Sequence, residues 1–204
     1  MVRPRFAKLP SAQQQAILSA ALNEFATHGF HDASLNRVID AAGISKGSMY
    51  YYFDSKEDLY IHVSRVELER LFDAVGPFSI PTETEPDTFW STLENYYLRL
   101  MIALTDSPQL AALIRGWLAA STSALQQAQQ ELEQSAMPWF ESALAAGQHV
   151  GAVRADLPSG LLIAVVVGMG QAMDTWLVTQ QPDAEALPRL VRALIGMIRR
   201  AIGP

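Results

Sequence analysis

The strongest fold signal in this 204-residue chain is a pair of short helix-forming segments separated by a glycine-containing turn. Apolar residues recur at helical spacing in residues 35–42, and Gly43 ends that segment after two turns. A second segment begins at Ser45 or Lys46 and continues to about residue 53. Because glycine readily adopts the left-handed backbone of a sharp turn, this arrangement predicts a helix-turn-helix, whose second helix enters the major groove of DNA.

The second of these helices has an inward and an outward face. Ile44, Met49 and Phe53 are expected to anchor it from beneath. The outward positions carry a cation, a small hydroxyl and two phenols, which suit contacts to phosphates and base edges, and a glycine permits close approach. These outward residues are Lys46, Gly47, Ser48, Tyr50 and Tyr51.

The rest of the chain also has helical periodicity, with no strand-like alternation of useful length. A first helix is expected from Ser11, with Ser11 and Gln14 as a capping box, to a stop at Gly29. A fourth is expected from Ser55 to Val75, before Gly76 and Pro77. Further helices are predicted at Asp87 to Thr105, Pro108 to Ala120, Ser123 to Gly147 with a kink or break at Pro138, Ser159 to Gln180, and Asp183 to Ile202.

The predicted fold is therefore all-α, with a small N-terminal unit and a larger helical body. Residues 1–54 form the expected DNA-binding domain, and residues 55–204 form the expected ligand-binding and dimerisation domain. The segment Pro77 to Pro86, with three prolines and no periodicity, is the expected linker or hinge-side loop. Charge supports two functional parts, since residues 1–53 have five Lys or Arg against three Asp or Glu, net +2, whereas residues 54–204 are net −8.

Composition excludes several classes of function. Cysteine is absent, which rules out disulfides, iron–sulfur clusters, thiolate-ligated zinc and cysteine nucleophiles, and favours a reducing cytoplasm. The basic N-terminus is followed by no apolar run, so a signal peptide is not expected. Leu161 to Gly170 is too short an apolar stretch for a spanning helix and is expected to be a buried helix, so no membrane partner is predicted.

One segment closely resembles the DNA-binding signature of the TetR family of regulators. The run from Ser34 to Phe53 reads SLNRVIDAAGISKGSMYYYF and is followed by DSKEDL, ending at Leu59. The resemblance covers roughly residues 11–63. It departs from the family at Ile39, where the family often has alanine, and at Ser34, which replaces the commoner threonine.

The resemblance implies a set of DNA contacts. Ser34 and Tyr50 would touch phosphates, Lys46 and Ser48 would lie at or beside bases, and Tyr51 would contact either. Lys56 would contact a phosphate from the start of the fourth helix. Arg37 and Gly47 complete the predicted interface.

The last two predicted helices carry apolar stripes. In the TetR family such a pair packs against its counterpart in a four-helix dimer interface, although packing within one chain would give the same pattern. A homodimer is favoured because half-site recognition also requires one. The interface candidates are Met169, Trp176, Leu187, Val191, Leu194, Ile195 and Ile198.

Aromatic and methionine side chains in the C-terminal part predict an apolar small-molecule pocket. The candidates are Trp90, Glu94, Tyr97, Met101, Trp117, Trp139, Phe140, Met173 and Asp174. Residues 76–180 contain three arginines against ten Asp or Glu. A buried anion would find few cations, so a neutral or cationic hydrophobic ligand is predicted, with Glu94 or Asp174 as counter-charge.

The resulting prediction is a ligand-responsive regulator, a repressor that binds a palindromic operator as a dimer and leaves it when a small molecule binds. No cofactor or metal is predicted, and an enzyme is disfavoured because His28 and His31 straddle a helix end while His62 and His149 are isolated. A dimeric DNA-binding protein without a ligand, or an activator, remains open. The residues do not specify the ligand, the operator, the regulated genes or the number of dimers per operator.

Overall fold

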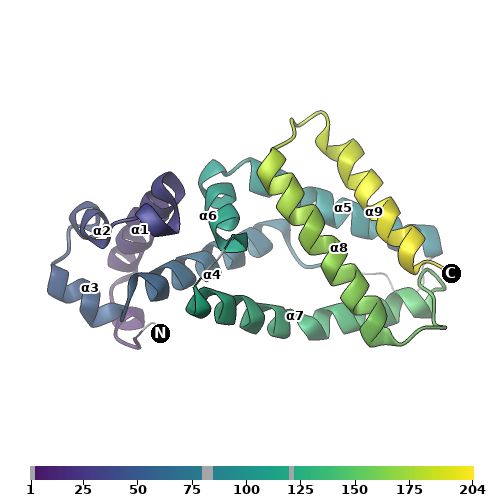
Figure 1. Ribbon diagram of the computed structural model, residues 1–204, viewed down its shortest axis with the longest axis horizontal. Coiled ribbons are helices and arrows are strands. Elements are labelled where there is room, and N and C mark those ends of the chain that lie inside the picture. The colour runs from purple at the N-terminus through teal and green to yellow at the C-terminus, as the bar shows by residue number, and fades with distance from the viewer. Residues whose placement is uncertain (1–2, 80–84, 120–121) are drawn as a thin grey trace. The chain divides into compact units, whose positions relative to one another are not determined.

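The computed structural model describes residues 3–79, 85–119 and 122–204, and all regular structure within these ranges is helical (Figure 1). The predicted all-α fold is thereby confirmed. The elements are η1 (Phe6–Lys8), α1 (Ser11–Asp32), α2 (Leu35–Ala42), α3 (Lys46–Tyr52), α4 (Lys56–Val75), α5 (Pro86–Thr105), α6 (Pro108–Leu118), α7 (Ser123–His149), α8 (Ser159–Gln180) and α9 (Leu187–Ile202).

The chain divides into two compact units, each built from two separate stretches. The first comprises Met1–Arg70 and Ser107–Gln129, and the second comprises Leu71–Asp106 and Gln130–Pro204. Two helices, α4 and α7, contribute residues to both units. The functional boundary expected at residue 54 is a different kind of division and stays a prediction.

The core of the first unit centres on Tyr60 of α4. This side chain is 1% exposed, and its hydroxyl donates to the backbone oxygen of Leu113 in α6 at 2.9 Å. The rings of Phe25 and Phe30 of α1 meet the Tyr60 ring edge-on, while Trp117 of α6 stacks on it. Aromatic packing around one buried hydroxyl therefore joins α1, α4 and α6.

Helix ends in the first unit follow the sequence signals in most places. Gly43 ends α2 in the left-handed conformation, with φ of 64°, as predicted. Ser45 caps α3 by accepting the Ser48 N–H at 3.0 Å, and Ser55 accepts the Asp58 N–H at 3.2 Å. Gly29 interrupts α1 with φ of 69°, but helical structure resumes and continues to Asp32.

The expected capping box at Ser11 is wrong. Pro10 occupies the N-cap position and Ser11 is already the first helical residue. Gln14 instead donates to the backbone oxygen of Leu9 at 2.8 Å, which fixes the chain before the helix. Because Ser11 is not the N-cap, Gln14 forms no capping box with it and binds the residues before the helix instead.

The second unit packs α9 against α5 and α8 (Figure 1). Trp90 of α5 is buried and donates its indole N–H to the Ala152 oxygen at 3.2 Å. Ion pairs also join α9 to α5, Arg192 to Glu94 at 3.1 Å and Arg199 to Asp87 at 2.6 Å. Buried contacts and exposed charges thus hold the same helix pair together.

Some of the expected helix bounds in the second half differ from the structure, and others fall on residues outside the described ranges. The last helix begins at Leu187 rather than Asp183, because the Asp183 carboxylate accepts the Ala186 N–H in the preceding turn. Pro138 lies inside α7, which continues to His149. Of the expected linker Pro77 to Pro86, residues 80–84 lie outside the described residues, as does Ala120 at the expected end of α6.

The apolar helix α8 is not buried as expected. Leu162, Ile163, Met173, Leu177 and Val178 are buried, but Leu161 is 50% exposed and residues 164–172 are half-buried or exposed. By length and composition α8 could cross a membrane, although the core helix of a soluble protein passes the same test. Only 28% of its most apolar window is buried, so the described residues of its own unit leave one face of α8 uncovered.

Candidate nucleic-acid interface

The helix-turn-helix forms at the predicted residues. Met49 and Phe53 are 0% and 1% exposed, so they anchor α3 from beneath. Tyr50 and Tyr51 are 45% and 47% exposed, and Lys46 is exposed at the first residue of the helix. The short helix therefore turns one cation and two phenols outward from a fixed base.

Ser48 and Gly47 occupy the first turn of α3. The Ser48 hydroxyl lies 2.8 Å from the Ser45 hydroxyl, so it shares the N-cap and is only half-buried. Gly47 is exposed, and an added Cβ would meet nothing closer than the Ser45 hydroxyl at 3.8 Å. Nothing within the chain requires glycine there, which is compatible with a close approach from outside.

Arg37 binds within the protein rather than pointing freely at solvent. Its guanidinium donates to both oxygens of Glu24, at 2.5 and 3.0 Å, and to the backbone oxygen of Asp32. Glu24 is 8% exposed and also accepts the Ser34 backbone N–H at 2.7 Å. The Arg37 hydrogen bonds and the Ser34 N–H lower the pKa of the Glu24 carboxyl against the opposing effect of burial.

This network changes the roles expected for Ser34 and Arg37. Arg37 ties α2 to α1, since it neutralises a buried carboxylate, and its DNA contact stays a prediction. Ser34 is the N-cap of α2, but its side chain makes no capping hydrogen bond. The Ser34 hydroxyl is therefore uncommitted and half-buried at the helix N-terminus.

Lys56 is likewise occupied by the protein. Its ammonium donates to the backbone oxygens of His31 and Ala33, at 2.9 and 3.1 Å, and lies 4.9 Å from the Phe30 ring centroid. These contacts satisfy carbonyl groups at the end of α1. The structure shows Lys56 capping the end of α1, and its phosphate contact stays a prediction.

The N-terminal segment is a feature that sequence patterns missed. Phe6 is 2% exposed, and its ring lies 5.0 Å from Phe53 and 5.2 Å from His62. The Arg3 guanidinium pairs with Asp54, and Arg5 lies over the ring of Tyr51. Arg3, Arg5 and Lys8 were visible as basic residues, but no periodicity connected them to α3.

His62 lies under this segment. Burial lowers the pKa of its imidazole, although Glu69 acts in the opposite direction. The His62 ring packs against Phe6 and Phe53, whose apolar rings favour the uncharged form of the imidazole.

The predicted ligand residues are only partly brought together. Trp90, Met101 and Met173 are buried in the second unit. The Tyr97 hydroxyl donates to the Asp174 carboxylate at 2.5 Å, linking α5 to α8. Burial raises the pKa of Asp174 in spite of this hydrogen bond.

The other ligand candidates have different surroundings. Glu94 pairs with Arg192, so its charge already has a partner. Trp117 belongs to the core of the first unit, whereas Trp139 is 39% exposed in the second and packs edge-on against Phe140 and Phe78. Two surface hollows are present in the second unit, and neither includes a residue predicted to bind the ligand.

Four of the seven dimer candidates are unavailable to a partner. Leu187, Val191, Ile195 and Ile198 are at most 5% exposed in the single chain, since this face of α9 packs on α5 and α8. Their apolar stripe serves the chain's own core, the alternative that spacing alone could not exclude. Leu194 and Met169 are half-buried.

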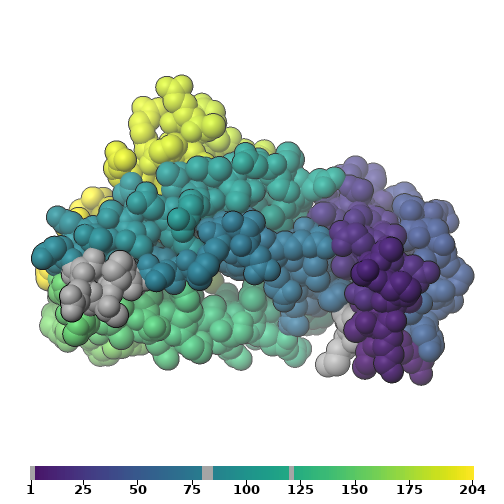
Figure 2. Space-filling view, turned by 180° about the vertical axis from the view of Figure 1, so that it is seen from behind, coloured from purple at the N-terminus to yellow at the C-terminus, as the bar shows by residue number. Residues whose placement is uncertain are grey.

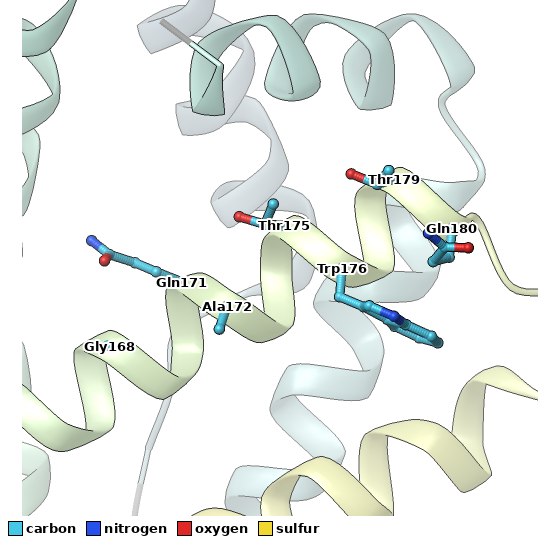
Figure 3. A pocket seen from close by; sticks show the side chains of 7 residues that line it. All are labelled: Gly168, Gln171, Ala172, Thr175, Trp176, Thr179 and Gln180. Carbon is cyan, nitrogen blue, oxygen red and sulfur yellow. The ribbon is translucent and has the colours of Figure 1, made fainter.

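Trp176, by contrast, is 47% exposed on α8. It borders a hollow of about 540 Å³ whose lining residues, with Gly168, Ala172 and Thr179 among them, all belong to α8 (Figure 3). A large ring beside small side chains on an uncovered helix offers a shape that a second helix could fill.

The N-terminal region is similar to known regulators. Residues 17–63 match the family model described as bacterial regulatory proteins, tetR family. The HTH-type transcriptional regulator RutR of Escherichia coli (strain K12) is 51% identical over 59 residues, which are 29% of this chain and 28% of RutR. The HTH-type transcriptional repressor AcnR of Corynebacterium glutamicum is 33% identical over 67 residues, 33% of this chain and 36% of AcnR. The chain thus matches about a third or less of the length of these relatives.

Solved structures resemble the chain over most of its length. The fatty acid degradation regulator FadR from Bacillus halodurans has a TM-score of 0.74 and 21% identity, covering 94% of this chain and 96% of that one. A transcriptional regulator FadR from Bacillus subtilis, solved in complex with stearoyl-CoA, has a TM-score of 0.70 and 20% identity, covering 90% and 96%. At such identities the likeness establishes the fold alone.

Proposed function

Because this chain belongs to the TetR family of bacterial regulators, we propose that it is a homodimeric, ligand-responsive transcriptional repressor. The observation that carries the proposal is α3, a capped helix anchored by Met49 and Phe53 that turns Lys46, Tyr50 and Tyr51 outward. A cation and phenols on a helix preceded by a glycine turn suit DNA phosphates and base edges. The named relatives are transcriptional regulators, which disfavours an enzyme.

The best-supported of the proposed DNA contacts are Lys46, Tyr50 and Tyr51, with Gly47 and Ser48 in the first turn of α3. Ser34 stays in the set as an uncommitted hydroxyl at the start of α2. Arg37 and Lys56 stay in it only as residues whose charge reaches DNA from positions fixed by Glu24 and by the end of α1.

We place the dimer contact on the exposed side of α8, with Trp176 and Met169 of α8 and Leu194 of α9 as the remaining candidates. Support comes from the uncovered apolar helix and from the two-fold symmetry that a palindromic operator requires. A regulator of this kind acts in the cytoplasm, where its operator is.

The proposed ligand is a small hydrophobic molecule, neutral or cationic, bound in the second unit. Asp174 is the counter-charge that remains after Glu94 is paired with Arg192, and its raised pKa marks a carboxylate whose charge a bound cation would stabilise. Since α4 contributes residues to both units, it is one covalent route by which a ligand could bias the DNA-binding helices.

The test begins with selection of genomic DNA fragments by the purified protein, followed by mobility shifts on the selected fragments. Recovery of a palindromic sequence bound by a dimer is expected. Binding with equal affinity to a scrambled duplex of the same length and base composition would contradict the proposal.

Ligand response is tested on the same fragment with matched hydrophobic ammonium, alcohol and carboxylate compounds. Stearoyl-CoA is included because it is bound to one structural neighbour. Release by the ammonium or alcohol series, reduced by Asp174→Asn for the ammonium, is expected. Release confined to carboxylates or stearoyl-CoA would contradict the charge preference, and no release by any series would favour the ligand-free alternative.

A further inference from the structure

The N-terminal segment, residues 3–9, is fastened to the recognition helix α3 and the residues that follow it. The Arg3 N–H donates to the Tyr52 oxygen at 3.0 Å, and the Arg3 guanidinium pairs with Asp54. Phe6 is 2% exposed, with its ring 5.0 Å from that of Phe53. These three contacts, made by the residues on either side of Arg5, fix the position of Arg5 relative to α3.

Arg5 itself is exposed and lies against α3. Its guanidinium carbon is 4.3 Å from the centroid of the Tyr51 ring, and Tyr51 is 47% exposed. Arg3, Arg37 and Arg70 of the same unit each hold a carboxylate. Arg5 has no carboxylate partner among the described residues, so no acidic side chain there neutralises its charge.

We propose that Arg5 is a DNA-phosphate contact, held in place by the Tyr51 ring at the C-terminal end of the recognition helix. A guanidinium that rests its face on an aromatic ring keeps its in-plane N–H donors free, and those donors match a phosphate. Lys46 stands at the first residue of α3, five residues before Tyr51, which is about 8 Å along a helix axis. Two cations so separated reach different phosphates.

Figure 2 shows the purple N-terminal residues on the outside of the protein. Arg5 adds a second cation to the recognition surface formed by Lys46, Tyr50 and Tyr51, on which Lys46 is the first. The protein has a net charge of −6, and each cation that neutralises a phosphate adds to the counterions released when DNA binds.

The inference rests on the proposed function, and its experiment separates the two. Full-length protein is titrated against an operator fragment recovered by selection and against a scrambled duplex, at salt concentrations from about 50 to 200 mM. Arg5→Ala is expected to weaken binding to both duplexes by the same factor, several-fold, and to reduce the log–log salt slope by about 0.9. Arg5→Lys is expected to keep the slope, because it keeps the charge.

Lys8→Ala is the charge-matched control, since Lys8 is also exposed on the segment but has no contact with α3 in the described structure. It is expected to leave the slope unchanged. Circular dichroism and sedimentation verify that every variant retains its fold and assembly.

Tyr51 supplies a second, independent test. Tyr51→Ala removes the ring and is expected to reduce the effect of Arg5→Ala by about twofold to fivefold in a double-mutant cycle. Tyr51→Phe keeps the ring and is expected to keep the full effect of Arg5→Ala.

The possible results separate the proposed Arg5 contact from the proposed function of the protein. An unchanged salt slope in Arg5→Ala, while Lys46→Ala lowers it, overturns the Arg5 contact and leaves the proposed function intact. A change in operator preference without a change in slope also overturns it, because that result assigns Arg5 to base recognition. A parent protein that binds operator and scrambled duplex equally overturns the proposed function instead.

Discussion

The recognition helix α3 and the helix α8 are both surface helices, yet they differ in what the rest of the chain does for them. The seven residues of α3 rest on buried Met49 and Phe53, and its outward side chains are polar or phenolic. The 22 residues of α8 are mostly apolar, and much of that apolar surface is uncovered. A few individual side chains make up the outward face of α3, whereas the exposed side of α8 is long and largely apolar.

The contrast also separates α8 from α9. The stripe of α9 is satisfied inside the chain by α5 and α8, while Trp176 and Leu161 of α8 are about half exposed. The same apolar periodicity therefore marks a buried face in α9 and a largely exposed face in α8. The following predictions test the difference, and the largest effect is expected where an apolar stripe is fully buried.

Ile198→Glu is expected to unfold or severely destabilise the chain, by about 4 kcal/mol or more, because Ile198 is 4% exposed and a buried charge lacks a partner there. Thermal unfolding measures the effect. Ala193→Glu, at an exposed position of the same helix, is the control and should change the melting temperature little. If Ile198→Glu kept normal stability and lost only the dimer, Ile198 would belong to the dimer interface instead.

Ala172→Glu combined with Trp176→Glu is expected to leave the fold intact and to weaken the dimer about 100-fold or more, roughly 3 kcal/mol, with a matching loss of operator binding. The reason is that both positions are exposed on the uncovered side of α8. Sedimentation at several concentrations measures the effect, with Ala145→Glu on exposed α7 as the control. An unchanged dimer would remove this face from the proposal.

Lys46→Ala is expected to weaken operator binding about tenfold and to lower the salt slope by about 0.9, because it removes one phosphate-neutralising charge from α3. Tyr50→Phe, which removes only a hydroxyl, is expected to weaken binding less and to leave the slope unchanged. Fluorescence anisotropy across a salt titration measures both. If both variants bind like the parent, α3 is not the recognition helix.

The smallest effects concern pH, and they have opposite signs in the two units. The pKa of His62 is lowered by burial, so the unfolded chain binds the proton more readily, and stability falls as pH drops below about 6.5 towards the folded pKa. The pKa of Asp174 is raised by burial, so its contribution is fully present below about 3.9 and is lost as pH rises through the folded pKa.

Melting temperatures from about pH 3.5 to 8 test both signs, because this interval includes the ordinary pKa of Asp, about 3.9, and that of His, about 6.5. His62→Gln is expected to flatten the loss of stability on the acid side. Asp174→Asn is expected to stabilise the protein near neutral pH, because it removes a buried charge and keeps an acceptor for the Tyr97 hydroxyl. An unchanged acid-side slope in His62→Gln, or a destabilised Asp174→Asn, would contradict the corresponding assignment.

Local signals determined the fold class and the position of the DNA-binding helices. Gly43, Ser45 and Ser55 act on the backbone within four residues of themselves, so their turn and caps were predictable from sequence. Met49 and Phe53 were also predictable as inward residues, because the period of a short helix fixes which side chains share a face.

Tertiary structure alone decided which charges and apolar faces are free. The sequence presents Arg37, Lys56 and Arg5 as equivalent surface cations, but only the fold brings Glu24 to Arg37, the end of α1 to Lys56, and Tyr51 to Arg5. The stripes of α8 and α9 likewise look alike in sequence, and α5 covers one of them. Periodicity specifies that a face is apolar, but what covers that face depends on contacts between residues that are distant in the chain.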